Sequence, residues 1–250
     1  MNTKTSQETN NKLNIPVDGV ASSGKGTLTK PLAELLGYKL LDAGSMYRAV
    51  AVFFDQRNIN PDEVPNYLER IENINYDGQI PYVNNEPYCD NIIRTPHVDK
   101  IVAQYGAKPR LKRLIIDAQN LITSQTKGWI AEGRNMAFDA MGNPDTTIYL
   151  YADIHVRALR RWMQQRLPQH EFINVLADLK LRDDTDINHQ NPPLMRPEDA
   201  KKHYEYFIDT TYGSEYDNFL KLVDISKQKG ALIQKNKLEH IIKKYNFIKE

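Results

Sequence analysis

The chain has 250 residues, 40% of them hydrophobic and 26% charged, so it is long enough for one sizeable domain or for a core domain with an insertion. Its formal net charge of +1 gives no overall basic field, which argues against nucleic acid as a main partner. The single cysteine, Cys89, excludes an intrachain disulfide, and no apolar run approaches the roughly 18 residues that a membrane span needs. We therefore expect a cytoplasmic protein with no membrane partner, and we expect a monomer. Residues 1–12 are polar and lack the apolar core of a secretory signal, so we predict a disordered tail there.

The first predicted strand, at residues 13–18, leads into the motif on which the rest of the chain depends. Four residues separate Gly19 from Gly24 and Lys25, which is the G-x-x-x-x-G-K spacing of a phosphate-binding loop. Glycines let backbone amides turn toward a phosphate, the predicted helix Lys25–Leu36 adds the positive end of its dipole, and the lysine adds a point charge. The alternative is a glycine-rich turn with an exposed lysine. We predict that ATP phosphates are held by Gly19, Ser22, Ser23, Gly24, Lys25, Gly26 and Thr27.

Two prolines lie inside these first elements. Pro16 lacks a ladder donor, so we expect the first strand to be irregular or to begin late. Pro31 is expected to kink the helix that follows the loop, and Gly37 to end it.

The amino-acid composition changes between residues 58 and 91, where prolines, asparagines and tyrosines are frequent. Short strands are predicted at 73–77 and 80–83, around Asp77–Gly78. A helical segment begins near Pro96. We interpret residues 58–105 as a small inserted β-rich unit.

Strands and helices alternate along the remaining chain, which predicts an α/β fold with a doubly wound parallel sheet. Ligands of such sheets bind at the carboxyl ends of the strands. Four distinctive segments fall at predicted strand ends: the loop after Gly19, residues 42–44, residues 132–134 and residues 209–211. Strands are predicted at 38–41, 129–131, 146–151 and 206–208, and helices at 46–54, 109–125, 154–165 and 172–182.

Arginines and carboxylates recur at helical spacing in the last third of the chain. Arg157, Arg160 and Arg161 stand at i, i+3 and i+4, so they share one helical face; on an isolated helix this would be a solvated basic surface. Beside a phosphate-binding loop, the three guanidinium groups suit a lid that closes over a transferring phosphate. Arg182 and Asp186 are also four residues apart, and the simplest alternative is a helical salt bridge worth only ~0.3–0.5 kcal/mol.

Taken together, these motifs resemble those of bacterial-type cytidylate kinases over most of the chain. The matching segments, in order, are 18–27 (DGVASSGKGT), 42–48 (DAGSMYR), 93–98 (IRTPHV), 132–134 (EGR), 157–161 (RALRR), 182–186 (RDDTD) and 209–211 (DTT). The resemblance implies a P-loop NTPase core whose parallel sheet is flanked by helices, at residues 13–57 and 106–250. It also implies that residues 58–105 bind a nucleoside monophosphate and that a helical lid lies at about 153–171.

The resemblance further implies roles for individual residues. Lys25, Arg157, Arg160 and Arg161 would be catalytic, and Thr27 with Glu132 would arrange Mg²⁺ through water. Arg48, Arg134 and Arg182 would hold the acceptor phosphate and Asp186 its ribose, with Asp42 and Arg94 in the same acceptor site. The nucleophile would be a phosphate oxygen that is already ionised, so no general base is required.

The departures from the family pattern concentrate where the base is read. The Ser, Arg and Asp that contact cytosine in the family correspond to Ala103, Lys112 and Asn135, and a further family arginine corresponds to His189. An asparagine offers a donor or an acceptor by rotating its amide, whereas an ionised Asp can only accept. We therefore predict that the preference for CMP over UMP is weakened by one to two orders of magnitude.

The sequence thus predicts an ATP- and Mg²⁺-dependent kinase that phosphorylates a pyrimidine nucleoside monophosphate: CMP or dCMP, with UMP as a further acceptor. One alternative is a P-loop kinase with a different small-molecule acceptor, which an acceptor screen would identify. Another is an ATP-binding protein with weak or no kinase activity, which paired ATPase and kinase assays would distinguish.

Overall fold

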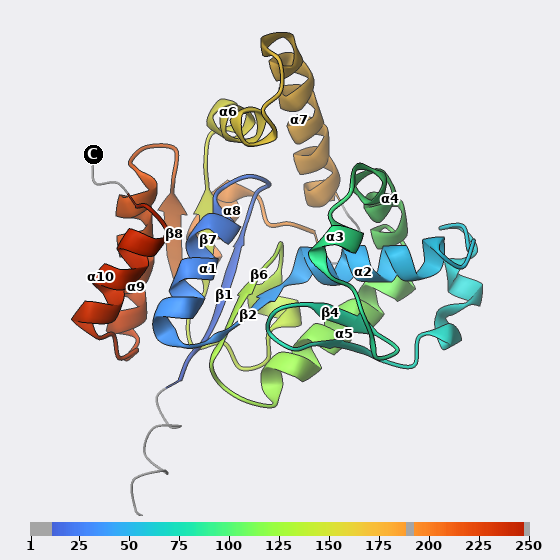
Figure 1. Cartoon of the computed structure of the whole chain (residues 1–250), viewed down its shortest axis with the longest axis horizontal. Coiled ribbons are helices and arrows are strands. Elements are labelled where there is room, and N and C mark those ends of the chain that lie inside the picture. Colours follow the sequence, from blue (N-terminus) through green and yellow to red (C-terminus); the bar gives the residue numbers. More distant parts are fainter. Residues whose placement is uncertain (1–11, 189–192, 248–250) are drawn as a thin grey trace, which may run out of the picture.

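The computed structural model describes residues 12–188 and 193–247 and has a parallel sheet at its centre (Figure 1). The strand order is β2-β6-β1-β7-β8, and every neighbouring pair is parallel. The α/β prediction is confirmed. The strands are β1 (Asn14–Gly19), β2 (Lys39–Asp42), β6 (Trp129–Glu132), β7 (Ile148–Tyr151) and β8 (Tyr206–Asp209).

The central strand β1 is fully buried and regular, contrary to the expectation for Pro16. Pro16 pairs with Ala131 of β6, whereas pairing with β7 begins only at Val17. Proline has no backbone N–H to donate, but at position 16 pairing with β7 has not yet begun. No hydrogen bond between the strands is therefore lost.

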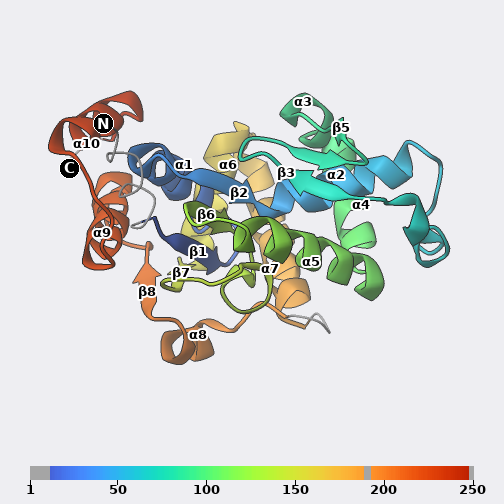
Figure 2. The same cartoon turned by 90° about the horizontal axis from the view of Figure 1, so that it is seen from below.

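Helices cover both faces of the sheet because successive strand residues point in opposite directions (Figure 2). Ile130 belongs to the hydrophobic cluster that includes α1, α9 and α10, whereas its neighbour Ala131 belongs to the cluster that includes α2 and α5. Glu34 of α1 accepts hydrogen bonds from Lys244 (2.6 Å) and Tyr245 (2.9 Å), which fasten the C-terminal helix to the helix after the phosphate loop. The bounds are α1 (Lys25–Leu36), α2 (Ala43–Asp55), α5 (Pro109–Ser124), α9 (Glu215–Gln228) and α10 (Lys235–Lys244).

The segment predicted as an inserted β-rich unit contains both strands and helices. Its antiparallel sheet has the order β3-β4-β5, and the turn at Gly78 (φ 102°) joins the first two strands. Both α4 and β4 pack against α2 and share one hydrophobic cluster with it, so the unit has no separate core. The elements are β3 (Ile74–Tyr76), β4 (Pro81–Val83), β5 (Glu86–Pro87), α3 (Asp90–Ile93) and α4 (Pro96–Gly106), after short 3₁₀ turns at Val64–Asn66 and Leu68–Arg70.

A helical hairpin, α6 (Ile154–Gln165) and α7 (Phe172–Asn188), projects beyond the sheet (Figure 1). The 3₁₀ turn Gln169–Glu171 connects the two helices, and α8 (Pro197–His203) precedes β8. A small cluster that includes Ala158 of α6 and Leu179 of α7 joins the hairpin to the phosphate loop at Ala21. Helix α7 extends beyond residue 182, where its end was predicted. In the part of the chain that is described, no helix is long and apolar enough to cross a membrane.

Candidate active site

The loop between β1 and α1 has the geometry of an anion-binding turn. Ser22 (φ 57°) and Gly24 (φ 91°) both adopt left-handed backbone conformations, and α1 begins at the next residue. The ammonium group of Lys25 donates to the carbonyl oxygens of Gly19 and Val20, each at 2.8 Å. Among the described residues, the buried hydroxyl of Ser23 has no hydrogen-bond partner. A phosphate oxygen would give this orphaned hydroxyl a partner, so the loop fits the phosphates of ATP.

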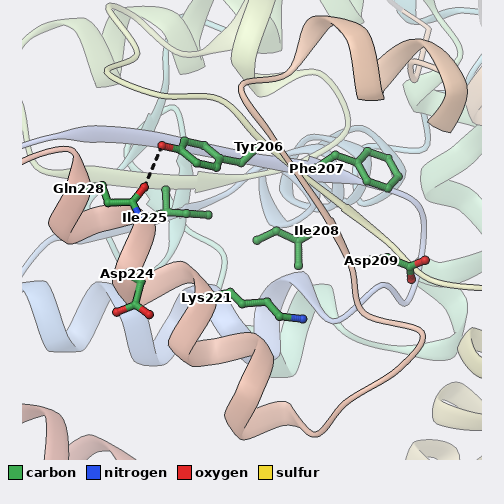
Figure 3. Close-up of a pocket in the computed structure, with 8 residues that line it drawn as sticks. All are labelled: Tyr206, Phe207, Ile208, Asp209, Lys221, Asp224, Ile225 and Gln228. Atoms are coloured by element: carbon green, nitrogen blue, oxygen red, sulfur yellow. Dashed lines mark hydrogen bonds between the residues drawn. The ribbon is translucent and has the colours of Figure 1, made fainter.

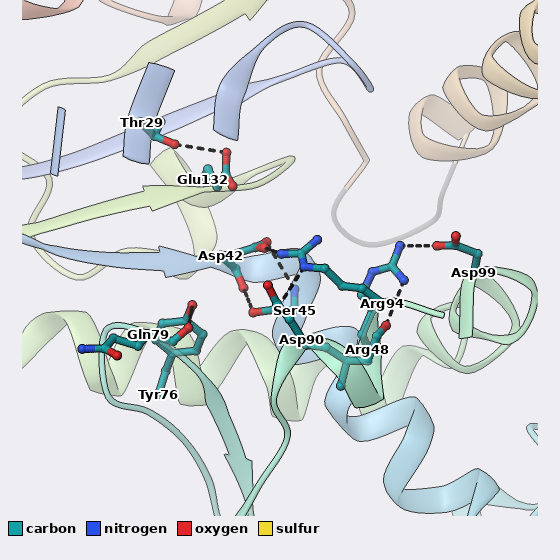
Figure 4. A network of polar contacts seen from close by, with 11 residues as sticks. Thr29, Asp42, Ser45, Arg48, Tyr76, Gln79, Asp90, Arg94, Asp99 and Glu132 are labelled. Atoms are coloured by element: carbon teal, nitrogen blue, oxygen red, sulfur yellow. Dashed lines mark hydrogen bonds and ion pairs between the residues drawn. The ribbon is translucent and has the colours of Figure 1, made fainter. Parts of the chain in front are cut away.

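Glu132, at the carboxyl end of β6, lies against the start of α1 (Figure 4). Its carboxylate accepts a hydrogen bond from the Thr29 hydroxyl at 3.2 Å. A Cβ atom on Gly26 would lie 3.3 Å from the nearer Glu132 oxygen, so a glycine here leaves room for that carboxylate. Burial, reinforced by Asp42, raises the pKa of Glu132, while burial and then Arg134 lower the pKa of Lys25. Thr27 is exposed in the same turn of α1. Carboxylate and hydroxyl oxygens suit Mg²⁺ that keeps several waters.

Two arginines, Arg134 and Arg182, lie close enough to Lys25 to lower its pKa. Arg134 donates to the Gly19 carbonyl oxygen at 2.7 Å and forms an ion pair with Asp186 at 2.7 Å. The pKa of Arg182, whose side chain is exposed, falls to about 10, chiefly because of Arg134, then through partial desolvation of its guanidinium group, with further contributions from Arg161 and Arg48. Positive charges this close to one another repel, so the cluster favours a bound anion.

Asp18 positions the segment that carries Arg134, a role that the sequence analysis missed. Its buried carboxylate accepts hydrogen bonds from the backbone amides of Met136 (2.7 Å) and Ala137 (2.9 Å) and from the Tyr204 hydroxyl (2.9 Å). An aspartate directly after the apolar residues 15–17 of a predicted buried strand was the available signal, because a buried carboxylate requires partners.

The residues of segment 58–105 and of α2 that were predicted for the acceptor site form a second network with Asp42 (Figure 4). Asp42 caps the start of α2 by accepting from the Ser45 amide at 3.2 Å, and it accepts from Arg94 at 2.7 Å. Arg48 donates to the Ile93 carbonyl oxygen at 3.1 Å and pairs with Asp99 at 2.5 Å. The ion pair with Asp42 holds Arg94 at the carboxyl end of β2, whereas Arg48 is held by α3 and α4.

The three arginines predicted to share one face have separate partners. Arg157 is 3% exposed and donates to the Ala152 and Ala21 carbonyl oxygens (2.9 and 3.1 Å) and to Asp183 (2.6 Å). Arg160 donates instead to Thr210, at its hydroxyl (3.1 Å) and its carbonyl oxygen (2.5 Å). Of the three, Arg161 is the one that lowers the pKa of Arg182. Helix packing buries Arg157, so the three side chains do not point to one place in this structure, and their joint action on a transferring phosphate stays a prediction.

Thr210 also connects the end of β8 to the phosphate loop. Its hydroxyl donates to the Ser23 carbonyl oxygen at 3.0 Å. Sequence position placed residues 209–211 at a strand end, and this contact brings that strand end to the loop.

The three proposed base-reading positions lie on three different elements: Ala103 on α4, Lys112 on α5 and Asn135 just before the π-helical segment Met136–Ala140. Asn135 donates from its amide to Asp139, and burial lowers the pKa of Lys112 against the opposing effects of Asp186 and Asp139. Ala103 is exposed on α4. His189 and the predicted tail, apart from Lys12, lie outside the described residues.

A hollow at the outer edge of the sheet lies between β8 and α9 (Figure 3). The Tyr206 hydroxyl donates to Gln228 at 3.3 Å across one end of it. Apart from Asp209, its lining residues are not among those predicted for the site, and we assign this hollow no part in phosphoryl transfer. The lining residues are Tyr206, Phe207, Ile208, Asp209, Lys221, Asp224, Ile225 and Gln228.

A lysine-bearing loop at the end of a central parallel strand, surrounded by arginines, defines a P-loop kinase. The chain belongs to the cytidylate kinase family, because the model of that family matches residues 15–228. A cytidylate kinase of Fervidobacterium nodosum is 32% identical over 219 residues, which cover 86% of this chain and 96% of that protein. One of Serratia proteamaculans is 34% identical over 193 residues, covering 74% and 84%. The predicted family and the transferase class are confirmed.

Proposed function

We propose that this protein transfers the γ-phosphoryl group of ATP to a pyrimidine nucleoside monophosphate, CMP or dCMP, with UMP as a further acceptor. The observation that carries the proposal is the cluster of Lys25, Arg134 and Arg182, whose repulsion an incoming pair of phosphates would relieve. Family membership supports the nucleoside monophosphate as the acceptor class.

The site residues divide between donor and acceptor. The loop amides, Ser23 and Lys25 would hold ATP phosphates, and Mg²⁺, placed by Thr27 and Glu132 through water, would neutralise part of their charge. Arg48, Arg134 and Arg182 would hold the acceptor phosphate, and Asp186 would accept from the ribose once Arg134 turns to the ligand. Asp42 and Arg94 would shape the same acceptor site. Because the attacking oxygen is already ionised, holding the two phosphates in line is sufficient and no base is needed.

The proposed division of the chain follows from these roles. Residues 58–105 would bind the acceptor, and the core at 13–57 and 106–250 would bind ATP. We also propose that the protein is a cytoplasmic monomer.

The proposal predicts that a panel of acceptors at fixed ATP and Mg²⁺ will show turnover with CMP and dCMP, weaker turnover with UMP, and none with hydroxyl acceptors such as simple sugars. Each product is separated by ion-exchange chromatography. Transfer to a hydroxyl acceptor but to no nucleotide would support the alternative small-molecule kinase. Hydrolysis of ATP without any transfer would support the weak ATP-binding protein.

The predicted lid at about 153–171 leads to an expectation about exchange rates. In this structure α6 is tied to the loop and the sheet through Arg157 and Arg160, while Met163 on α6 is 63% exposed. We expect backbone amides of residues 157–170 to exchange faster than those of α5 in the free protein, and to become protected when a bisubstrate analogue binds. Hydrogen exchange read by mass spectrometry measures both. Equal exchange in the two states would remove the lid from the mechanism.

A further inference from the structure

The side chain of Asn135 is held by Asp139, which lies one turn further along the π-helical segment Met136–Ala140. The Asn135 amide nitrogen donates to the Asp139 carboxylate, and the Asp139 backbone amide contacts the Asn135 carbonyl oxygen at 3.4 Å. The same segment is fixed to β1 by the two backbone hydrogen bonds to Asp18. The contact is therefore built on an anchored backbone.

The chemistry of the two groups determines which way the amide faces. An ionised carboxylate can only accept hydrogen bonds, so the amide must present its nitrogen to Asp139. The oxygen, Oδ1, lies in the same plane as the nitrogen but on the opposite side of Cγ, so it points away from Asp139. In the part of the chain that the structure describes, Oδ1 receives no hydrogen bond. Asn135 thus offers an acceptor, as an Asp would, and the free rotation assumed from the sequence does not hold.

The charges around the pair strengthen this assignment. Lys112 lies close enough to Asp139 and Asp186 for both carboxylates to affect its titration. The carboxylate of Asp139 therefore lies near a cationic donor, Lys112, as well as near the Asn135 amide nitrogen, and a carboxylate accepts hydrogen bonds from both kinds of group. Asp186 forms an ion pair with Arg134, which we propose to hold the acceptor phosphate. Asn135 is the next residue in the chain after Arg134, so it lies beside the proposed acceptor-phosphate site.

We propose that Asp139 is a positioning residue for specificity: by fixing the Asn135 amide, it makes the site accept a hydrogen bond from an exocyclic amine and so favours an aminopyrimidine over an oxopyrimidine monophosphate. This inference rests on the proposed function. An aminopyrimidine such as cytosine donates to Oδ1, whereas uracil places a carbonyl oxygen against it. One hydrogen bond of this kind changes the ratio of kcat/KM for CMP over UMP by about three- to tenfold.

The test is Asp139→Asn in the full chain, with Asp117→Asn as a matched control. Asp117 is an exposed carboxylate on α5 paired with Arg113, so it undergoes the same change of charge outside the site. In Asp139→Asn the new amide can donate to Asn135, which allows the latter to turn its nitrogen toward the base. We expect the CMP/UMP ratio to fall about three- to tenfold, through KM for the two acceptors, with kcat and KM for ATP unchanged. Asp139→Glu keeps an acceptor and should retain most of the ratio.

Several outcomes separate this inference from the function on which it rests. If the unaltered protein phosphorylates no nucleoside monophosphate, the proposed function fails and the inference fails with it. If it phosphorylates CMP but Asp139→Asn leaves the ratio unchanged, the inference alone is overturned. An equal loss of activity with both acceptors, together with a lower melting temperature, would also overturn it by assigning Asp139 a structural role. If Asp139→Asn does not fold, Asp139→Ser replaces it, because a serine hydroxyl can also donate a hydrogen bond to Asn135. The same fall in the CMP/UMP ratio is expected.

Discussion

Replacing Lys25 with alanine should lower the rate of phosphoryl transfer by ~100-fold or more and leave the protein folded. A preorganised charge that neutralises the transferring group is worth about this much in other enzymes. Folding should be retained for two reasons. The ammonium group bonds within its own loop, to two backbone carbonyl oxygens, and burial and Arg134 disfavour its charged form, as the lowered pKa of Lys25 indicates. Steady-state kinetics and thermal denaturation measure the two effects.

Lys30→Ala is the matched control for this change. Lys30 is exposed on the same helix, so its removal should alter neither rate nor melting temperature. A Lys25→Ala protein with near-full activity would show that the loop does not hold the transferring phosphate. An unfolded one would show that Lys25 serves packing.

Replacing Arg182 with alanine should lower kcat/KM for the acceptor by roughly 100-fold while KM for ATP changes little. The proposed role of Arg182 is to hold the acceptor phosphate, and its pKa is lowered to about 10 chiefly by repulsion from Arg134. Removing one of these like charges should not destabilise the free protein, so the melting temperature should not fall.

Lys180→Ala serves as the control for the loss of one positive charge from α7, because Lys180 is an exposed lysine on the same helix. A matching loss of activity in Lys180→Ala would show that the overall charge of the helix, not a specific contact, binds the acceptor. A rise in KM for ATP in Arg182→Ala, with the acceptor unaffected, would move this arginine to the donor side.

Local patterns were sufficient to predict several elements. Helix α1 occupies Lys25–Leu36 as expected, because its apolar spacing and the left-handed Gly37 (φ 67°) mark a face and an end. Helix α6 likewise occupies the predicted residues. The positions of residues 42–44, 132–134 and 209–211 at strand ends followed from the alternation of strands and helices.

Tertiary contacts decided what the sequence could not. Pro16 is tolerated because of where the ladder with β7 begins, which depends on strand register. Arg157 is buried because α6 packs on α7 and on the loop, although its spacing matched that of Arg160 and Arg161. The orientation of the Asn135 amide depends on Asp139, a residue whose role no local motif indicated.

The central claim is that the protein transfers phosphate from ATP to a nucleoside monophosphate, and ³¹P NMR of a mixture of ATP, Mg²⁺, CMP and the protein tests it most directly. We expect the resonances of CDP and ADP to grow together in equal amounts, and to be absent with Lys25→Ala. Growth of ADP and inorganic phosphate with CMP unchanged, or no reaction with CMP, dCMP or UMP, would contradict the account.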